Sequence, residues 1–181
     1  IIAVAALEEG VIGLNDTVNC TGIYKEISPA LRCWIYPGQH GPLDVVHGIQ
    51  NSCNVFFSEM GHRLSMDENG NYSPELGIEK IRKYASLFGL DETSGIEIAE
   101  REPQMTTEKP EASSIGQGKN SYSNIQLSRY ITAVANKGTV FKLSLLDKMT
   151  DSQGNLLKDF TPEVRSTIDV KDSTWNAVHT G

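Results

Sequence analysis

Two small polar side chains, Ser52 and Asn54, flank Cys53 at a point where an apolar run ends and an aromatic one begins. A serine hydroxyl can pass a proton between neighbouring groups, and an asparagine carboxamide can align a substrate by donating a hydrogen bond. The alternative is helix capping, in which Asn51 or Ser52 accepts a bond from the N–H groups of the following turn. Local sequence alone favours capping, so the surrounding elements are needed to decide.

The spacing of apolar residues predicts a helix on each side of this point. Pro42 is suited to the first turn of a short helix over residues 42–50, because proline lacks the N–H that a first turn leaves unpaired. A second helix is expected over about residues 53–64. Its apolar side would consist of Phe56, Phe57, Met60 and Leu64. Ser52 and Asn54 are therefore expected at a corner between two helices.

Further helices are expected where apolar residues recur with helical spacing. Three such runs cover residues 1–9, 75–88 and 124–137 and stop at Gly10, Gly89 and Gly138, and a shorter one begins at Asp172 or Ser173. The residues expected to be buried are Ile78, Ile81, Ala85 and Phe88 in the second run and Ile125, Tyr130 and Val134 in the third.

Strand signals are fewer. Ile96 and Ile98 alternate in a short strand-like piece, and residues 141–149 and 156–160 flank a polar turn, which predicts a hairpin. Loops are expected over residues 11–41 and over roughly 20 residues before Tyr122. Helices followed by an antiparallel hairpin indicate an α+β fold of which this chain holds only part of the sheet.

Both ends of the sequence predict unfinished elements. Helical spacing is already present at Ile1 without a capping residue, and the last run has only about two turns after its cap. Residues 1–181 are accordingly expected to be one partial domain, truncated at both ends.

Composition excludes several classes of protein. The formal net charge of −7, with scattered lysines and arginines, disfavours binding to a nucleic-acid backbone. No apolar run approaches the roughly 18–20 residues that a membrane-spanning helix needs.

The cysteines Cys20, Cys33 and Cys53 are spaced neither as a C-x-x-C redox pair nor as a four-ligand zinc site. Three buried thiols are the favoured interpretation, and a disulfide between Cys20 and Cys33 stays open for an oxidising compartment.

Other motifs are better explained as ordinary structure. The stretch "GQGKNS" at 116–121 has Ser113 in place of the first glycine of a phosphate-binding loop and Asn120 in place of its metal-binding hydroxyl. The acidic turn "DENGN" lacks the closing glutamate of a calcium loop. The histidines form no i, i+4 pair, which disfavours a zinc hydrolase.

A series of motifs nevertheless occurs in a distinctive order. It consists of "IIAVAALEEGVI", "CTGIY", "RCW", "HGPLDVVHGIQNSCNVFF", "LGIEKIRKYASLFGL", "SGIEIAE", "SIGQG" and "NIQLSRYITAVANKGT". In this order and spacing the chain resembles the transpeptidase domain of penicillin-binding proteins, most closely the monofunctional class B type. The resemblance covers nearly the whole chain, and it implies a β-lactamase/transpeptidase-like fold, mostly the helical subdomain plus an antiparallel hairpin of the sheet.

The resemblance also implies a mechanism. Enzymes of this family use S-x-x-K, S-x-N and K-T-G elements to acylate a serine. Only the S-x-N element is present here, as Ser52, Cys53 and Asn54. It implies that Ser52 relays a proton and that Asn54 aligns the substrate, whereas Cys53 points into the core. The nucleophilic serine would lie upstream of Ile1 and K-T-G downstream of Gly181, so the chain alone should be inert.

The implied role is that of a serine-type DD-transpeptidase, anchored to the cell membrane and facing outward, which needs no metal and no cofactor. Its expected partners are stem peptides of peptidoglycan that end in D-alanyl-D-alanine, β-lactam antibiotics, and proteins of cell-wall synthesis or division. The alternatives are an inactive or sensor-type relative, and less favourably a serine β-lactamase or carboxypeptidase. Class A β-lactamases carry Asp at the position of Cys53.

Overall fold

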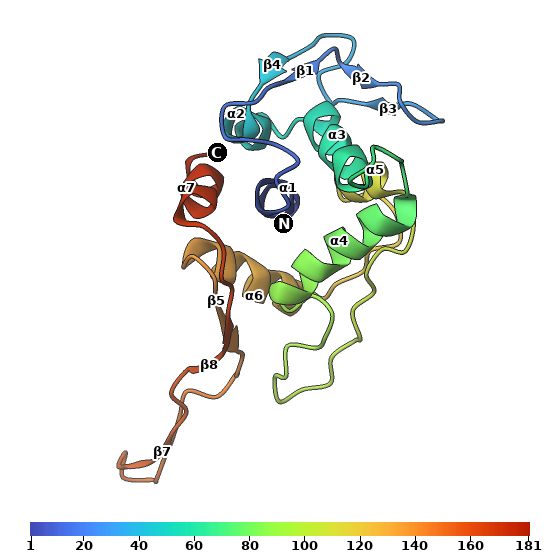
Figure 1. Ribbon diagram of the computed structural model, residues 1–181. Coiled ribbons are helices and arrows are strands. Elements are labelled where there is room, and N and C mark those ends of the chain that lie inside the picture. The colour runs from blue at the N-terminus through green and yellow to red at the C-terminus, as the bar shows by residue number, and fades with distance from the viewer. The chain divides into compact units, whose positions relative to one another are not determined.

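The computed structural model describes all residues, 1–181, and divides them into two compact units (Figure 1). Unit 1 comprises Ile1–Ala85, Met105–Asn120 and Val170–Gly181. Unit 2 comprises Ser86–Gln104 and Ser121–Asp169. The candidate residues Ser52 and Asn54 both belong to unit 1.

Unit 1 is built around a short central helix. Its helices are α1 (Ile2–Glu8), α2 (Val45–Gln50), α3 (Asn54–Leu64), α4 (Pro74–Leu87, whose last two residues belong to unit 2), α5 (Pro110–Ser113) and α7 (Asp172–Thr180). Helix α1 contacts α3 and α7, and its Ala5 and Ala6 are fully buried (Figure 1). Small side chains at these positions let neighbouring helices approach closely, which explains how a helix of seven residues is held in the core.

The long N-terminal loop of unit 1 contains two small antiparallel sheets. Strand β1 (Val18–Cys20) pairs with β4 (Gly41–Leu43), and β2 (Ile23–Tyr24) pairs with β3 (Leu31–Arg32). The expectation that Pro42 begins a helix is wrong, because Pro42 lies in β4 opposite Asn19. A two-stranded sheet has only edges, and an edge tolerates a residue without an N–H.

Helix α2 begins later than the sequence suggested and is capped by an aspartate. The carboxylate of Asp44 accepts a hydrogen bond of 2.9 Å from the His47 backbone N–H. That bond is the largest cause of a pKa below the ordinary value for Asp44. The last helix, α7, has Lys171 as its N-cap without a side-chain bond, so neither Asp172 nor Ser173 acts as the predicted cap.

Unit 2 consists of α6 (Asn124–Ala135) and two strand pairs. Strand β5 (Thr139–Lys142) pairs with β8 (Glu163–Thr167), and β6 (Lys148–Thr150) pairs with β7 (Leu156–Asp159), both antiparallel. The β6–β7 pair is the predicted hairpin. Helix α6 begins with a reciprocal capping box between Ser123 and Gln126.

Helix α6 buries a different face from the one expected. Gln126, Arg129 and Ala133 are buried, whereas Ile125, Tyr130 and Val134 are only half-buried. The Arg129 guanidinium donates hydrogen bonds to the backbone oxygens of Gly89, Glu92 and Thr93. These bonds connect α6 to the start of the loop that follows α4. Apolar periodicity cannot anticipate a buried cation that is satisfied by backbone carbonyls.

The predicted strand at Ile96 and Ile98 is also absent. The segment is held by side chains instead, because Glu100 accepts bonds from the Ser94 N–H (2.6 Å) and hydroxyl (2.7 Å). Ile98 is 60% exposed, so the alternation did not mark a buried face.

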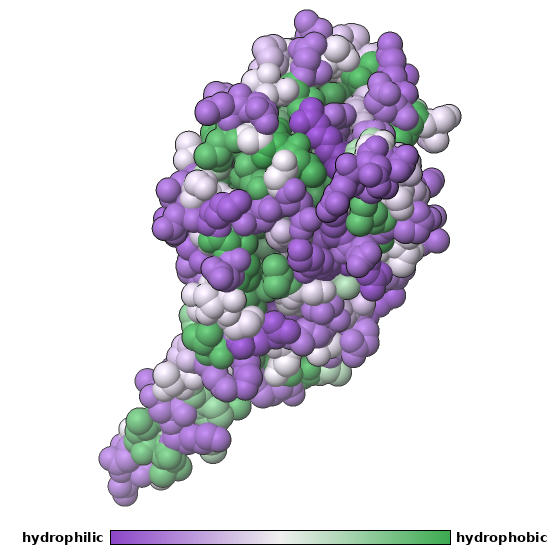
Figure 2. All heavy atoms as spheres, viewed as in Figure 1, coloured by the Kyte–Doolittle hydropathy of each residue, from purple (hydrophilic) through white to green (hydrophobic).

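Polar residues cover most of the face shown in Figure 2, with apolar patches between them. The β6–β7 hairpin has three exposed apolar side chains, Met149, Leu156 and Leu157. None of the helices has the length and apolar character that crossing a bilayer requires.

Candidate functional site

The α2–α3 corner carries Ser52 and Asn54, as predicted. Helix α2 ends in a Schellman motif with Asn51 as its C-cap: the Ser52 N–H donates to the Ile49 carbonyl at 2.9 Å, and the Cys53 N–H donates to the Gly48 carbonyl at 3.1 Å. Helix α3 then starts at Asn54. Two helix ends are therefore satisfied within four residues, and the corner has a defined backbone.

Ser52 occupies the left-handed position of this motif, with φ at +46°. Glycine is the usual residue there, because a side chain costs roughly 1–2 kcal/mol in this conformation. The Ser52 side chain is exposed. A strained, exposed serine where glycine would fit better is typical of a residue retained for its side chain.

Cys53 points into the core and caps α3. It is fully buried, and its Sγ accepts a hydrogen bond of 3.4 Å from the Phe56 N–H. The capping interpretation of Asn51 and Ser52 is thus wrong for α3, because the cap is supplied by the cysteine between the two polar residues.

Asn54 is positioned by the strand opposite the corner. Its Nδ2 donates a hydrogen bond of 3.0 Å to the Arg32 carbonyl at the end of β3. The residue is half-buried. A second contact comes from the same strand region, since Trp34 Nε1 donates to the Asn51 carbonyl at 2.9 Å. The β3 segment thus fixes both sides of Ser52.

Aromatic and apolar side chains of α3 pack beneath the corner, on its core side. Phe56 and Met60 are fully buried, and Phe57, which meets Phe56 edge-to-face at 5.3 Å, is half-buried. Gly48 in α2 lies directly against Phe56, and a Cβ added there would be 2.7 Å from the ring. This requirement for glycine was not evident from the sequence.

The arrangement presents one free hydroxyl and one oriented carboxamide on a rigid support. Such a pair can pass a proton and hold a peptide, but it contains no strong base and no activated nucleophile of its own. It would act only together with further groups. A groove of about 870 Å³ between the β2–β3 hairpin, α4 and α5 is lined by other residues and does not include Ser52 or Asn54.

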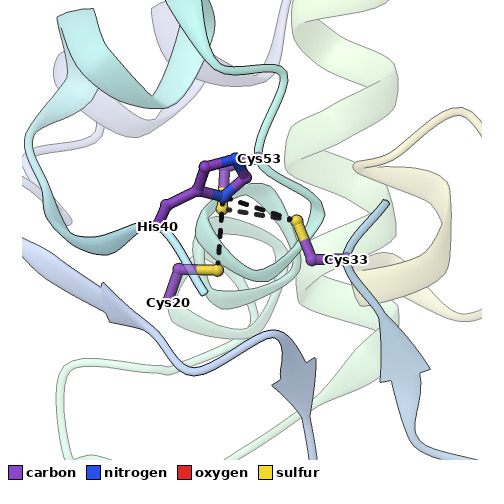
Figure 3. A group of neighbouring side chains, drawn as sticks. All are labelled: Cys20, Cys33, His40 and Cys53. Atoms are coloured by element: carbon purple, nitrogen blue, oxygen red, sulfur yellow. Dashed lines mark hydrogen bonds between the residues drawn. The ribbon is translucent and has the colours of Figure 1, made fainter. Parts of the chain in front are cut away.

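Sequence reasoning missed a second feature of the corner. The fold brings Cys20, Cys33 and Cys53 together with His40, and all three cysteines are free thiols (Figure 3). Three buried thiols were predicted, but their convergence on a histidine was not. Their spacing in sequence carries no sign of it, because the four residues come from four different segments.

The family model of the penicillin-binding protein transpeptidase domain matches residues 1–181. The chain belongs to this family. Penicillin-binding protein 2A of Bacillus subtilis (strain 168) is 25% identical over 97% of this chain. Peptidoglycan D,D-transpeptidase MrdA of Escherichia coli (strain K12) is 26% identical over 99% of it. The relatives are class B penicillin-binding proteins, as the resemblance implied.

The fold of the transpeptidase domain is confirmed by solved structures. Penicillin-binding protein A from M. tuberculosis, in a ceftriaxone acyl-enzyme complex, superposes with a TM-score of 0.76 at 16% identity, over 97% of this chain and 38% of that one. This chain spans only 26% of the length of the B. subtilis relative and 29% of the E. coli one.

Proposed function

We propose that this chain is the part of a serine-type peptidoglycan DD-transpeptidase domain that supplies the second catalytic motif. The observation that carries the proposal is the strained left-handed Ser52, exposed at a corner where α2 ends in a Schellman motif and Cys53 caps α3. The family and the names of the relatives supply the reaction class.

In the proposed mechanism a serine outside this chain attacks the D-alanyl-D-alanine carbonyl and forms an acyl-enzyme. Its proton leaves as the C–O bond forms, and the departing amine must gain a proton as the amide bond breaks. The Ser52 hydroxyl is the relay for this proton, because it can accept from one neighbour while donating to another.

Asn54 is the positioning group of the pair. Its bond to the Arg32 carbonyl fixes the amide plane, and this leaves one N–H and the carbonyl oxygen for a bound peptide or β-lactam. Holding the reacting carbonyl in a near-attack geometry contributes several kcal/mol to catalysis.

The full-length protein is further proposed to be anchored in the cell membrane with this domain outside the cytoplasm. Its substrates there would be peptidoglycan stem peptides, its inhibitors β-lactams, and its protein partners other components of cell-wall synthesis.

The experiment is intact-mass spectrometry of the full-length protein after incubation with penicillin, followed by peptide mapping. The expected result is one penicilloyl adduct on a serine N-terminal to the residues described here. Turnover of a D-alanyl-D-alanine peptide would then separate an enzyme from a sensor, which would stay acylated. Absence of any adduct would overturn the proposal and leave an inactive member of the family.

A further inference from the structure

The four side chains of Cys20, Cys33, His40 and Cys53 form a compact group, here called the Cys3His cluster. Cys20 ends β1, Cys33 follows β3, His40 precedes β4, and Cys53 caps α3. Their sulfur and nitrogen ligand atoms all lie within 4.8 Å of one another, and Figure 3 shows them pointing toward a common centre. We propose that this cluster is a structural Zn²⁺ site.

The separations within the cluster match a tetrahedral zinc site. Zn–S bonds of about 2.3 Å and Zn–N bonds of about 2.0–2.1 Å place sulfurs about 3.8 Å apart and sulfur and nitrogen about 3.5 Å apart. The Nδ1 atom of His40 lies 3.4 Å from Cys20 Sγ and 3.7 Å from Cys33 Sγ. Cys33 Sγ and Cys53 Sγ are 3.9 Å apart. These three separations are close to the tetrahedral values, and no pair of ligand atoms is more than 4.8 Å apart.

The polar groups of the cluster are poorly satisfied without a cation. The three cysteines are almost completely buried, at 0%, 2% and 0% exposure in chain order. The hydrogen-bond partners of His40 Nδ1 are the sulfurs of Cys20 and Cys33. Thiols are weak hydrogen-bond partners, so a metal ion would supply the favourable interaction that these groups otherwise lack.

Backbone groups are already arranged around the sulfurs. The Phe56 N–H donates to Cys53 Sγ. The backbone N–H groups of Ile35, Asn54 and Val55 are directed at the Cys33 sulfur. Such outer-shell donors stabilise the thiolate form, which is the form that binds metal.

The ligand set selects the ion. Three thiolates and one imidazole in tetrahedral geometry suit Zn²⁺, whereas Mg²⁺ and Ca²⁺ require oxygen ligands. Four protein ligands leave no open position for water, so the site would be structural and not catalytic. This inference replaces the expectation that the chain needs no metal, which came from the family resemblance, and it also revises the argument from cysteine spacing.

The metal would cross-link segments that have little regular structure to hold them. The strand pairs between residues 18 and 43 are two or three residues long, too short to be rigid alone. Cys53 lies between Ser52 and Asn54, so the same ion would fix the backbone of the candidate site. This positioning role rests on the proposed function, whereas metal binding itself does not.

The first experiment measures metal content and thiol reactivity of the full-length protein, purified without chelator. One zinc per chain is expected, with three thiols that resist alkylation until a chelator removes the metal. Replacing zinc with Co²⁺ should produce thiolate-to-cobalt charge-transfer bands and the intense visible bands of a tetrahedral site. Metal-free protein that fails to take up Zn²⁺, or protein two hydrogens lighter because a disulfide has formed, would overturn the site.

Variants separate the ligands from other histidines. His40→Gln should weaken zinc binding by at least about 10-fold, on the scale expected for disturbing a metal site. The exposed His47 provides the matched control, and His47→Gln should keep one zinc per chain. Equal zinc affinity of the two variants, measured by competition with a chelator, would exclude His40 as a ligand.

The positioning role has its own readout. Chelation followed by zinc readdition should slow and then restore penicillin acylation of the wild-type protein. If the zinc site is present but its removal leaves acylation unchanged, the site stands and the positioning role is overturned. If no acylation occurs with zinc bound, the proposed function fails independently of the metal site.

Discussion

At the scale of single residues, Ser52 links conformational cost to proposed chemistry. A left-handed φ is tolerated at the C′ position of a helix but favours glycine. The serine at this position therefore lowers the stability of the fold in return for a hydroxyl at the corner. The two following residues have different roles: Cys53 is buried in the core, and Asn54 is held by its hydrogen bond to the Arg32 carbonyl.

Ser52→Gly should separate these two effects. Removing the side chain from the left-handed position is expected to raise the free energy of unfolding by about 1 kcal/mol, or roughly 2–4 °C in Tm. Penicillin acylation of the full-length protein should fall by about 100-fold or more, because the proton relay is lost. Thermal unfolding and acylation kinetics measure the two quantities.

Two comparison variants complete that test. Ser52→Ala should lose acylation without gaining stability, because alanine keeps the unfavourable φ. Ser152→Ala, in the exposed β6–β7 turn, should change neither quantity. Unchanged acylation in Ser52→Gly would contradict the relay role, and a loss of stability would contradict the strain argument.

At the scale of elements, the contact of α2 with α3 depends on one missing side chain. Gly48 allows the Phe56 ring to lie against the α2 backbone, and both residues belong to the elements that form the corner. Packing of this kind tolerates little added volume, because the surrounding core cannot expand without loss of other contacts.

Gly48→Ala is accordingly expected to destabilise the protein by about 1–3 kcal/mol through overpacking. The added methyl would be 2.7 Å from Phe56 Cδ1 and must displace the ring. Chemical denaturation of wild type, Gly48→Ala, Phe56→Leu and the double variant measures the coupling. The smaller leucine should recover part of the loss, and strictly additive effects would show that the ring is not the cause.

At the scale of the whole molecule, stability depends on ionised groups that join distant segments. Glu9, just after α1, accepts hydrogen bonds from Lys83 Nζ at 2.7 Å and from the Tyr84 hydroxyl at 3.0 Å in α4. Burial raises the pKa of the Glu9 carboxyl, but these bonds and the charges of Lys83 and Lys80 outweigh it and lower the pKa below its usual value.

The sign of the pH dependence follows from this lowered pKa. The contribution of Glu9 is complete above the pKa of the unfolded chain and is lost as the pH falls through the lower pKa of the folded state. Glu9→Gln should reduce stability at pH 7 by about 1 kcal/mol. The difference from wild type should shrink in acid, as thermal unfolding across pH would show. A constant difference at every pH would assign the effect to packing.

Several elements followed from sequence alone because their causes are local. The glycine stop after α1, the amphipathic α4 and the β6–β7 hairpin are determined by periodicity and turn residues a few positions apart. The ordered motifs also indicated the family, and the apolar spacing placed Ser52 and Asn54 at the corner between two helices.

Other features of the corner and of the core could be seen only in the tertiary structure. Four observations could not be predicted from the sequence: the left-handed φ of Ser52, the close approach of Phe56 to Gly48, the burial of the Arg129 guanidinium among backbone carbonyls, and the convergence of three cysteines on His40. The last three require different elements of the chain to meet, and spacing along the sequence carries no information about that meeting. The conformation of Ser52 is local, but serine at this position gives no sign of a left-handed φ.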